Sequence, residues 1–181
     1  SRGGINVYSA NDDPNSGISN VLVRQCEVYN TGTDPDYAGC CLPLKNHVID
    51  VIVEYNYIHN PVRGIGMSFS TEPGFTGCEN AIVRHNIIKE VPSHCGMYIN
   101  GGGNKSFAIY GNIIMNNAYE GIRLATGLGD TLSGKIYNNT FYHNMKMQWS
   151  QELRIESNNA IIPVLEVKNN IFCAASTTRC L

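Results

Sequence analysis

The chain has 181 residues, of which 43% are hydrophobic and 15% are charged, a composition typical of one folded domain with a buried core. Its 13 Lys and Arg face 15 Asp and Glu, so the formal net charge of -2 argues against a surface that binds nucleic acid. No apolar run approaches the roughly 20 residues of a membrane span, and the first residues lack the charged and apolar regions of a signal peptide. We therefore expect a single domain over residues 1–181 with no nucleic-acid or membrane partner.

A repeat runs along the chain from residue 21 onward. Six segments share one pattern, in which two alternating apolar residues precede an Asn position by five and three residues, and another apolar residue follows it by two. The segments are Val21–Val28, Val51–Ile58, Ala81–Ile88, Phe107–Ile114, Gly134–Phe141 and Leu165–Phe172. The Asn position is filled by Cys26, Asn56, Asn86, Asn112, Asn139 and Asn170, at separations of 30, 30, 26, 27 and 31 residues.

A second element follows most copies of the repeat and consists of Gly, an apolar residue, any residue and another apolar residue. Its copies are Gly64–Met67, Gly96–Ile99 and Gly121–Leu124, with Gly4–Val7 and Gly39–Leu42 as looser relatives. Apolar residues alternate within both elements, which is the periodicity of a β-strand. Two or three short strands in each period of about 30 residues predict the coil of a β-solenoid.

Stacked coils would place the Asn residues in one column. An amide in such a column can donate to the amide of the next coil, and Asn also tolerates the left-handed backbone of a sharp bend. Because Cys26 interrupts the column, we expect the ladder of hydrogen bonds to begin at Asn56.

Together these elements resemble the right-handed parallel β-helix repeat of the pectate-lyase-like superfamily, over residues 4 to 173. The resemblance implies an all-β, single-stranded right-handed β-helix of about six turns, with three short parallel sheets and an internal Asn ladder. The family usually has a capping helix and more turns, so we expect a fragment or module of a longer protein. Its open ends would pair with another copy in a homo-oligomer or be covered by terminal segments. The resemblance also implies a secreted or periplasmic location.

In the resembling enzymes, the substrate lies along the outer face of the first sheet, which the Gly-containing element forms. Carried over by analogy, this places Tyr98 beside Arg123, with His94 and Glu120 just before the same strands. Arg123 could hold a uronate carboxylate while His94 or Tyr98 moves a proton, so these four residues are the candidate catalytic group. The alternative is ordinary surface packing in which Arg123 makes a cation–π contact with Tyr98.

Other side chains near this face are candidates for substrate binding. They are Asn100 and Arg63 at the first sheet, and His59 and Lys89 in a further outward column near the loops that lead to it. One more column, two residues before each Asn position, alternates in charge and then carries paired tyrosines. We expect it to stabilise the stack as lateral neighbours; it consists of Arg24, Glu54, Arg84, Tyr110, Tyr137 and Lys168.

Acidic pairs in two loops suggest a calcium site. Asp12 with Asp13, and Asp34 with Asp36, offer the oxygen ligands that calcium prefers, although Asp is also a common turn residue. We expect most of the seven cysteines to be buried thiols, and Cys173 with Cys180 to be the one pairing worth seeking.

Two classes of function remain open. The first is a carbohydrate-active module, a lyase or a hydrolase, that acts on an acidic polysaccharide or oligosaccharide. The second is a non-catalytic solenoid that binds glycan or builds a surface or appendage structure. The sequence contains no Gly-x-Ser-x-Gly, His-Glu-x-x-His or nucleotide-binding fingerprint, which argues against serine hydrolases, zinc proteases and dehydrogenases.

Overall fold

In the computed structural model of the chain, every regular element among the described residues is a β-strand. The structure describes residues 4–9, 16–32, 39–71, 76–100, 102–126, 131–144, 151–157 and 161–174. Within these ranges, no helix has the length and apolar character needed to cross a membrane.

Three parallel sheets of six strands form the fold. The first sheet contains β1 (Val7–Tyr8), β5 (Cys40–Lys45), β9 (Ile65–Ser70), β12 (Met97–Asn100), β15 (Ile122–Thr126) and β18 (Leu153–Ser157). The second sheet contains β3 (Leu22–Arg24), β7 (Ile52–Glu54), β10 (Ile82–Arg84), β13 (Phe107–Tyr110), β16 (Thr131–Tyr137) and β19 (Ile161–Lys168). The third contains β4 (Glu27–Val28), β8 (Tyr57–His59), β11 (Ile87–Lys89), β14 (Ile113–Met115), β17 (Thr140–Tyr142) and β20 (Ile171–Cys173). A separate pair consists of β2 (Ile18–Ser19) and β6 (Val48–Ile49).

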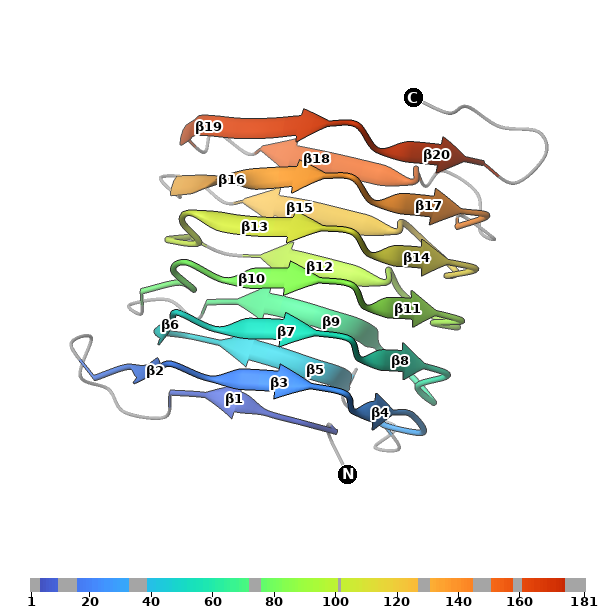
Figure 1. The fold of residues 1–181 in the computed structure, drawn as a ribbon, viewed down its shortest axis with the longest axis horizontal. Helices are drawn as coiled ribbons and strands as arrows, with labels where there is room; N and C mark the ends of the chain where they lie inside the picture. Colours follow the sequence, from blue (N-terminus) through green and yellow to red (C-terminus); the bar gives the residue numbers. More distant parts are fainter. Residues whose placement is uncertain are drawn as a thin grey trace.

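The chain passes through the three sheets in turn and then begins the next coil on top. In Figure 1 the second sheet lies in front with its strands running to the right, the first sheet lies behind with its strands running to the left, and each coil lies above the last, so the path is right-handed. Four inner coils, which begin at β5, β9, β12 and β15, pair with neighbours on both sides in all three sheets. The coils at the two ends pair on one side only. The expected parallel β-solenoid is therefore confirmed, with four fully paired turns; the expectation of about six counts both end coils.

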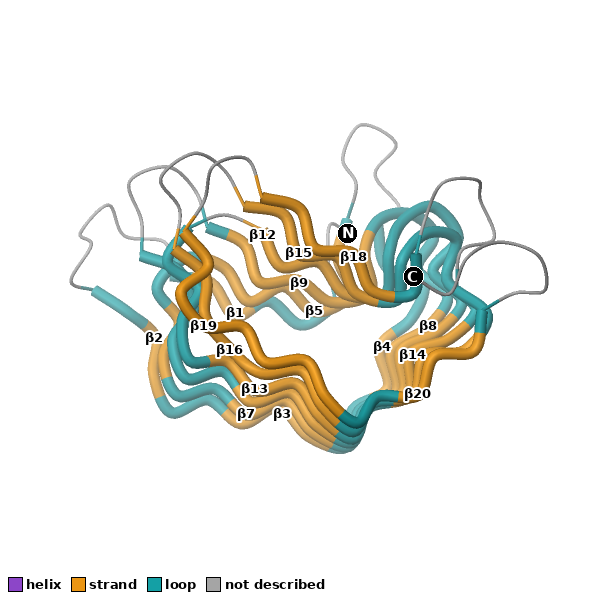
Figure 2. The backbone as a smooth tube through the Cα atoms, turned by 90° about the horizontal axis from the view of Figure 1, so that it is seen from above, coloured by secondary structure: helices purple, strands orange, loops and turns teal. Residues whose placement is uncertain are grey.

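The three sheets enclose the interior of the coils (Figure 2), and the buried hydrophobic side chains lie there. Inward side chains alternate with outward ones, as in β12, where Met97 and Ile99 are buried while Tyr98 and Asn100 are partly exposed. Strand register stacks the inward side chains into columns that run along the axis. One such column in the first sheet is Leu44, Phe69, Ile99 and Leu124, each at most 1% exposed.

The Asn ladder forms and begins at Asn56, as the sequence predicts. Each side-chain amide donates from Nδ2 to Oδ1 of the next Asn at 2.9–3.0 Å, and the backbone N–H of each donates to the same oxygen. Cys26 enters only through its backbone N–H, which donates to Oδ1 of Asn56 at 3.0 Å. The ladder therefore satisfies buried polar groups in every inner coil.

The left-handed bend lies one residue earlier than expected. The residues with φ of 53–56° at this corner are Gln25, Tyr55, His85, Asn138 and Asn169, and Gly111 has φ of 64°. Their positions all directly precede the Asn position, and the five side chains point to solvent, so the bend tolerates many residue types. The ladder Asn residues are thus required for their inward hydrogen bonds and not for the bend.

The glycines of the first sheet align differently from the sequence expectation. Met67 pairs with Met97, so Gly66, and not Gly64, lies beside Gly96 and Gly121. Gly64 is needed for another reason, because it has φ of 95° and a Cβ there would lie 1.6 Å from the carbonyl oxygen of Gly39.

The described cysteines are free thiols; Cys41, Cys78 and Cys95 are buried, whereas Cys26 and Cys40 are partly exposed, so burial holds for three of the six. Burial raises the pKa of the Cys78 thiol to about 12. Cys173 is exposed and free, and Cys180, its suggested partner, lies outside the described residues.

Candidate functional site

The outer face of the first sheet brings together side chains from four neighbouring coils. Register places Ser68, Tyr98, Arg123 and Arg154 in one outward column, because β9, β12, β15 and β18 pair in that order. His94 lies in the turn before β12, and Glu120 lies just before β15. The four candidate catalytic residues therefore lie at one end of two adjacent strands.

Aromatic contacts hold His94 against this face. Its ring centroid is 5.4 Å from that of Tyr98 and 6.1 Å from that of Tyr119. Burial, and then the nearby Arg123, lower the pKa of His94 below its ordinary value of 6.5, while Glu120 acts in the opposite direction. Burial likewise raises the pKa of Tyr98 above 10.0. At neutral pH the site thus contains a neutral imidazole beside a protonated phenol.

Glu120 is the most deeply buried group of the site, with 1% of its surface exposed. Its Oε1 accepts a hydrogen bond from Nη1 of Arg154 at 3.3 Å. Its Oε2 is buried and has no hydrogen-bond partner among the described residues. A buried carboxylate with a single ion-pair partner is costly, and such groups are enriched at functional sites.

Arg123 makes the cation–π contact with Tyr98 that one reading of the sequence predicts, and it also binds a carboxylate of the chain itself. Its guanidinium carbon lies 5.5 Å from the centroid of the Tyr98 ring. Its Nε and Nη2 also donate to one carboxylate oxygen, Oε2 of Glu156, at 3.0 and 2.7 Å. The other oxygen of Glu156 forms an ion pair with Nη2 of Arg154.

Arg154 and Glu156 belong to the site, yet sequence reasoning did not single them out. Glu152, just before their strand β18, lies where the preceding coils have Gly66, Gly96 and Gly121, so this segment does not match the Gly-containing element. The alternation of Leu153 and Ile155 with charged residues was the signal that could have identified it as a sixth copy.

The structure divides the four candidate substrate-binding residues between two faces. Asn100 points outward from β12, two residues beyond Tyr98 in the same strand, and Arg63 is exposed in the turn before β9. His59 and Lys89 instead pair on the outer face of the third sheet. The catalytic group and these two residues therefore do not form one site.

His59 is held by neighbours on the third sheet. It stacks on Tyr29 and Tyr57, with ring centroids 5.3 and 4.1 Å away, and its Nε2 lies 3.0 Å from Oε1 of Glu27. Lys89 lies over the Tyr57 ring, 5.4 Å from its centroid, and 3.4 Å from Oε1 of Glu90. These contacts account for both side chains as lateral neighbours on stacked strands.

Asp12, Asp13, Asp34 and Asp36, the candidate calcium ligands, all lie outside the described residues. In the described ranges, no group of three or more His, Cys, Asp and Glu is arranged to hold a metal ion.

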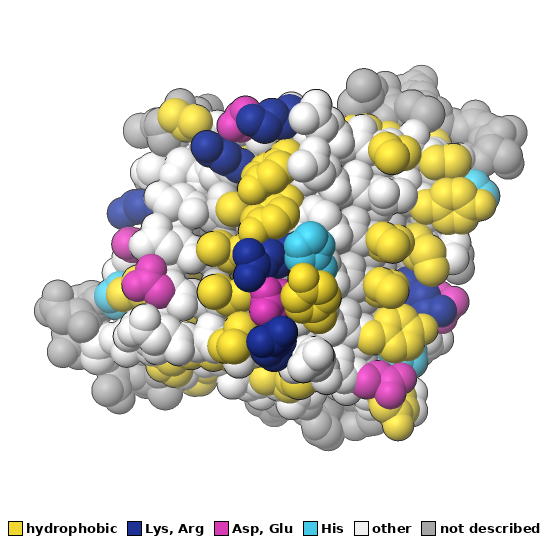
Figure 3. Space-filling model, in the orientation of Figure 1, with side chains coloured by type: hydrophobic (Ala, Val, Ile, Leu, Met, Phe, Trp, Pro, Cys, Tyr) yellow, Lys and Arg dark blue, Asp and Glu magenta, His cyan; other side chains and the backbone are white. Residues whose placement is uncertain are grey.

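The second sheet carries the predicted outward column. Glu54 forms ion pairs with Arg24 at 3.5 Å and Arg84 at 2.6 Å, and Arg84 donates to the hydroxyl of Tyr110 at 2.9 Å. The rings of Tyr110 and Tyr137 stack at 4.9 Å. Figure 3 shows basic and acidic side chains gathered near the middle of this face, between apolar ones.

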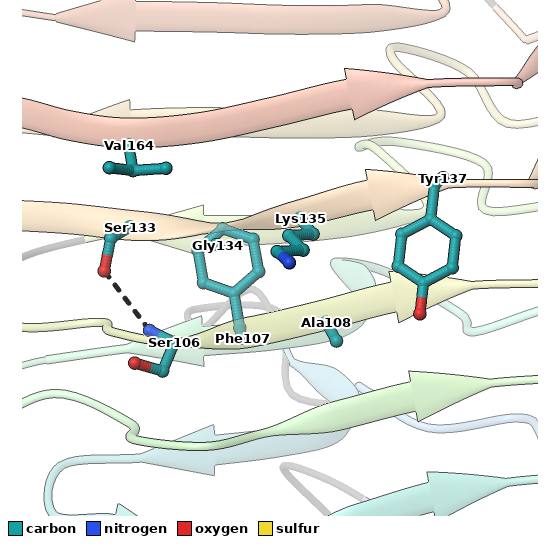
Figure 4. A pocket seen from close by; sticks show the side chains of 8 residues that line it. All are labelled: Ser106, Phe107, Ala108, Ser133, Gly134, Lys135, Tyr137 and Val164. Atoms are coloured by element: carbon teal, nitrogen blue, oxygen red, sulfur yellow. Dashed lines mark hydrogen bonds between the residues drawn. The ribbon is translucent and has the colours of Figure 1, made fainter.

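A shallow depression of about 570 Å³ lies on the same sheet, between β13, β16 and β19 (Figure 4). It is lined by Ser106, Phe107, Ala108, Ser133, Gly134, Lys135, Tyr137 and Val164. Ala108 is the small residue between Ile82 and Lys135 in its outward column, which leaves the surface hollow there. Lys135 and Tyr137 are its only titratable lining groups, so this depression does not have the paired acid and base of the first sheet.

No protein-family model, curated protein or solved structure matches this chain. Its function therefore has to be inferred from the geometry of its own residues.

Proposed function

We propose that this β-solenoid is a member of the pectate-lyase-like superfamily that cleaves an acidic polysaccharide on the outer face of its first sheet. The observation that carries the proposal is the convergence of His94, Tyr98, Glu120 and Arg123 from two adjacent coils. Stacked strands hold these groups in a fixed register, which is the preorganisation that acid–base catalysis needs.

The reaction that these groups suit is β-elimination from a uronate. A base removes the proton from C5, the bond between C4 and the bridging oxygen breaks, a C4–C5 double bond forms, and an acid protonates the departing oxygen. His94 is the base, because its lowered pKa leaves it neutral at pH 7. Tyr98 is the acid, because its raised pKa keeps its proton on the hydroxyl.

The two charged groups assist these proton transfers. Arg123 neutralises the uronate carboxylate, which makes the C5 proton more acidic. Glu120 favours the protonated form of His94 electrostatically, so it stabilises the imidazolium that forms when the C5 proton is taken.

A substrate screen tests the proposal. The purified chain is incubated with polygalacturonate, alginate and glycosaminoglycans, with and without calcium, while the ultraviolet absorbance of unsaturated uronates and the release of reducing ends are recorded. Absorbance should rise with one of these polymers, and His94→Ala and Tyr98→Phe should abolish the rise. The matched control is Arg24→Ala, which removes an outward ion-paired arginine from the second sheet and should keep the activity.

Two results would contradict elimination. A gain of reducing ends without absorbance would indicate a hydrolase that uses Glu120. Absence of both signals with every polymer would contradict catalysis.

The pH profile gives an independent check on His94. The base must be neutral, and its pKa lies below 6.5, so the rate should fall on the acid side only below pH 6.5. Initial rates between pH 4.5 and 8 measure this limb. A midpoint at or above 6.5 would show that another group is the base.

A non-catalytic glycan-binding solenoid is the second candidate. Two ion pairs favour it, Arg123 with Glu156 and Glu120 with Arg154. Their charges are compensated without a ligand. Retention of a polymer in a pull-down, without either product signal, would support this candidate over the lyase.

A further inference from the structure

Glu156 lies in a clamp made by two arginines of neighbouring coils. Arg123 donates two hydrogen bonds to Oε2 of Glu156, and Arg154 forms an ion pair with its Oε1. The two arginines are directly opposite each other in the register of β15 and β18. Like charges at paired positions repel, so the clamp needs an anion between the two guanidinium groups.

The second sheet provides a comparison, because Glu54 also lies between two arginines, Arg24 and Arg84. The side chain of Glu54 is 7% exposed and its strand, β7, is paired on both sides. The side chain of Glu156 is 28% exposed, and β18 is, among the described strands, at one edge of the first sheet. Glu54 is therefore fixed in its place, whereas Glu156 can turn toward solvent.

The charge balance of the site indicates which kind of group could replace Glu156 between the two arginines. The site holds two arginines and two carboxylates, Glu120 and Glu156, so its formal charge is zero. A further carboxylate that approached Arg123 would leave one buried negative charge uncompensated, unless one of the carboxylates left. Glu120 is 1% exposed and cannot leave, but Glu156 can.

We infer that Glu156 occupies the place of a ligand's acidic group, and that an anionic ligand binds by displacing it from Arg123 and Arg154. The exchange conserves charge, since one carboxylate replaces another between the same two guanidinium groups. An uncharged sugar cannot make this exchange, so Glu156 selects against neutral polymers. For a polysaccharide ligand the inference rests on the proposed function, but the clamp itself requires only an anion.

Glu156→Gln tests the inference, because glutamine keeps the shape of the side chain and removes the competing charge. Isothermal titration calorimetry measures binding of three probes: inorganic sulfate, trigalacturonate, and fully methyl-esterified trigalacturonate. We expect E156Q to bind the first two about tenfold more tightly than the wild type, because the anion no longer displaces a charge-assisted pair. Affinity for the uncharged ester should not change. The double variant Glu156→Gln with Arg123→Gln should lose the gain.

Glu54→Gln is the matched control, since it makes the same change between two arginines on the other face. It should leave sulfate binding at the level of the wild type, because its site is closed to ligands. An equal gain in E54Q would show a general effect of net charge and would overturn the inference. So would unchanged or weaker anion binding by E156Q, or no binding at all, in a protein whose circular dichroism spectrum shows that it is folded.

Binding and turnover separate this inference from the proposed function. Tighter binding by E156Q with no cleavage by either protein supports the clamp and refutes the lyase. Cleavage by the wild type without tighter binding by E156Q supports the lyase and refutes the clamp.

Discussion

At the scale of single residues, the ladder asparagines each make several buried hydrogen bonds. Oδ1 of Asn112 accepts from the backbone N–H and the Nδ2 of Asn86, and its Nδ2 donates to Asn139 and to the carbonyl of Val83. A buried donor that loses its acceptor keeps the full cost of its desolvation. Substitution of a ladder asparagine should therefore destabilise the protein more than the small size of its side chain suggests.

Asn112→Ala should therefore lower the free energy of unfolding by about 2 kcal/mol, since it leaves the buried backbone N–H of Asn86 without its acceptor at about 1–3 kcal/mol, whereas Nδ2 of Asn86 keeps the carbonyls of Val53 and Arg84. Chemical denaturation followed by circular dichroism measures the loss. Asn138→Gly, one residue before the next ladder position, is the control. It should change stability little, because glycine adopts the left-handed φ of 54° found there. Equal losses in both variants would show that the ladder bonds add nothing specific.

Cys26→Asn should have the opposite effect and extend the ladder by one step. The Sγ of Cys26 already lies 3.2 Å from the carbonyl oxygen of Arg24, where the Nδ2 groups of the ladder contact the equivalent carbonyls. An amide at this position would also donate to Oδ1 of Asn56. We expect a gain of about 1 kcal/mol, seen as a rise of a few degrees in Tm. Cys173→Asn, at an exposed thiol outside the column, should give no gain, and a gain equal to that of Cys26→Asn would rule out the ladder as its cause.

At the scale of elements, a second and shorter ladder ends just before β18. Asn117 donates from Nδ2 to Oδ1 of Asn144 at 2.7 Å, and the backbone N–H and Nδ2 of Asn144 both donate to the carboxylate of Glu152. Glu152 takes the place of the glycine found in the three coils before it, and its side chain replaces the missing next asparagine. This explains why the strand departs from the repeat.

Glu152→Ala should lower the free energy of unfolding by about 2 kcal/mol, because the backbone N–H of Asn144 loses its acceptor and its Nδ2 keeps only the carbonyl of Ile114. Glu152→Gln should cost less, since an amide oxygen still accepts and no charge is buried. Burial raises the pKa of Glu152, so the carboxylate itself is penalised in the folded state. Denaturation at pH 7 compares the two variants, and an alanine variant as stable as the glutamine variant would refute the capping role.

The contrast between β12 and β18 shows how far the sequence predicts this protein. Alternating apolar residues and the Asn column depend on local periodicity, so they reveal the strands, the sheets and the ladder. The same periodicity predicted that Tyr98 lies next to Arg123. It could not reveal that Arg123 binds Glu156, because that contact joins residues 33 positions apart through a strand that lacks the repeat's glycine. Nor could it show the two-residue offset of Gly64, which depends on a close approach between coils.

At the scale of the whole molecule, protection from solvent decreases toward the ends of the stack. Val83, Ile109 and Ile136, in three inner coils of the second sheet, are fully buried, whereas Val167 in the same column of the last coil is 39% exposed. In a solenoid each coil is stabilised mainly by its nearest neighbours, so coils with one neighbour open more readily.

Hydrogen exchange should show this gradient. Amides of β10 and β13 should exchange most slowly, and those of β19 and β20 should exchange at least about tenfold faster. A tenfold change corresponds to roughly 1.4 kcal/mol in the free energy of opening, and the missing interface with a further coil should lower that free energy by more than this. Mass spectrometry of peptides across the chain measures the rates. Uniform protection from β3 to β20 would indicate that the molecule unfolds only as one unit.

The ladders also give the solenoid an electrical direction. From Asn56 to Asn139, each ladder amide accepts on Oδ1 from the coil before it and donates one Nδ2 hydrogen to the Asn of the coil after it, so the oxygen ends of the amides face the same way and their dipoles add along the axis, whereas the dipoles of each strand alternate. The positive end of each row of amides faces the last coil. In the shorter row that end meets the carboxylate of Glu152, as an anion meets the N-terminus of a helix. The described part of the chain contains no helix, and its side-chain amides thus build the electrostatic equivalent of one.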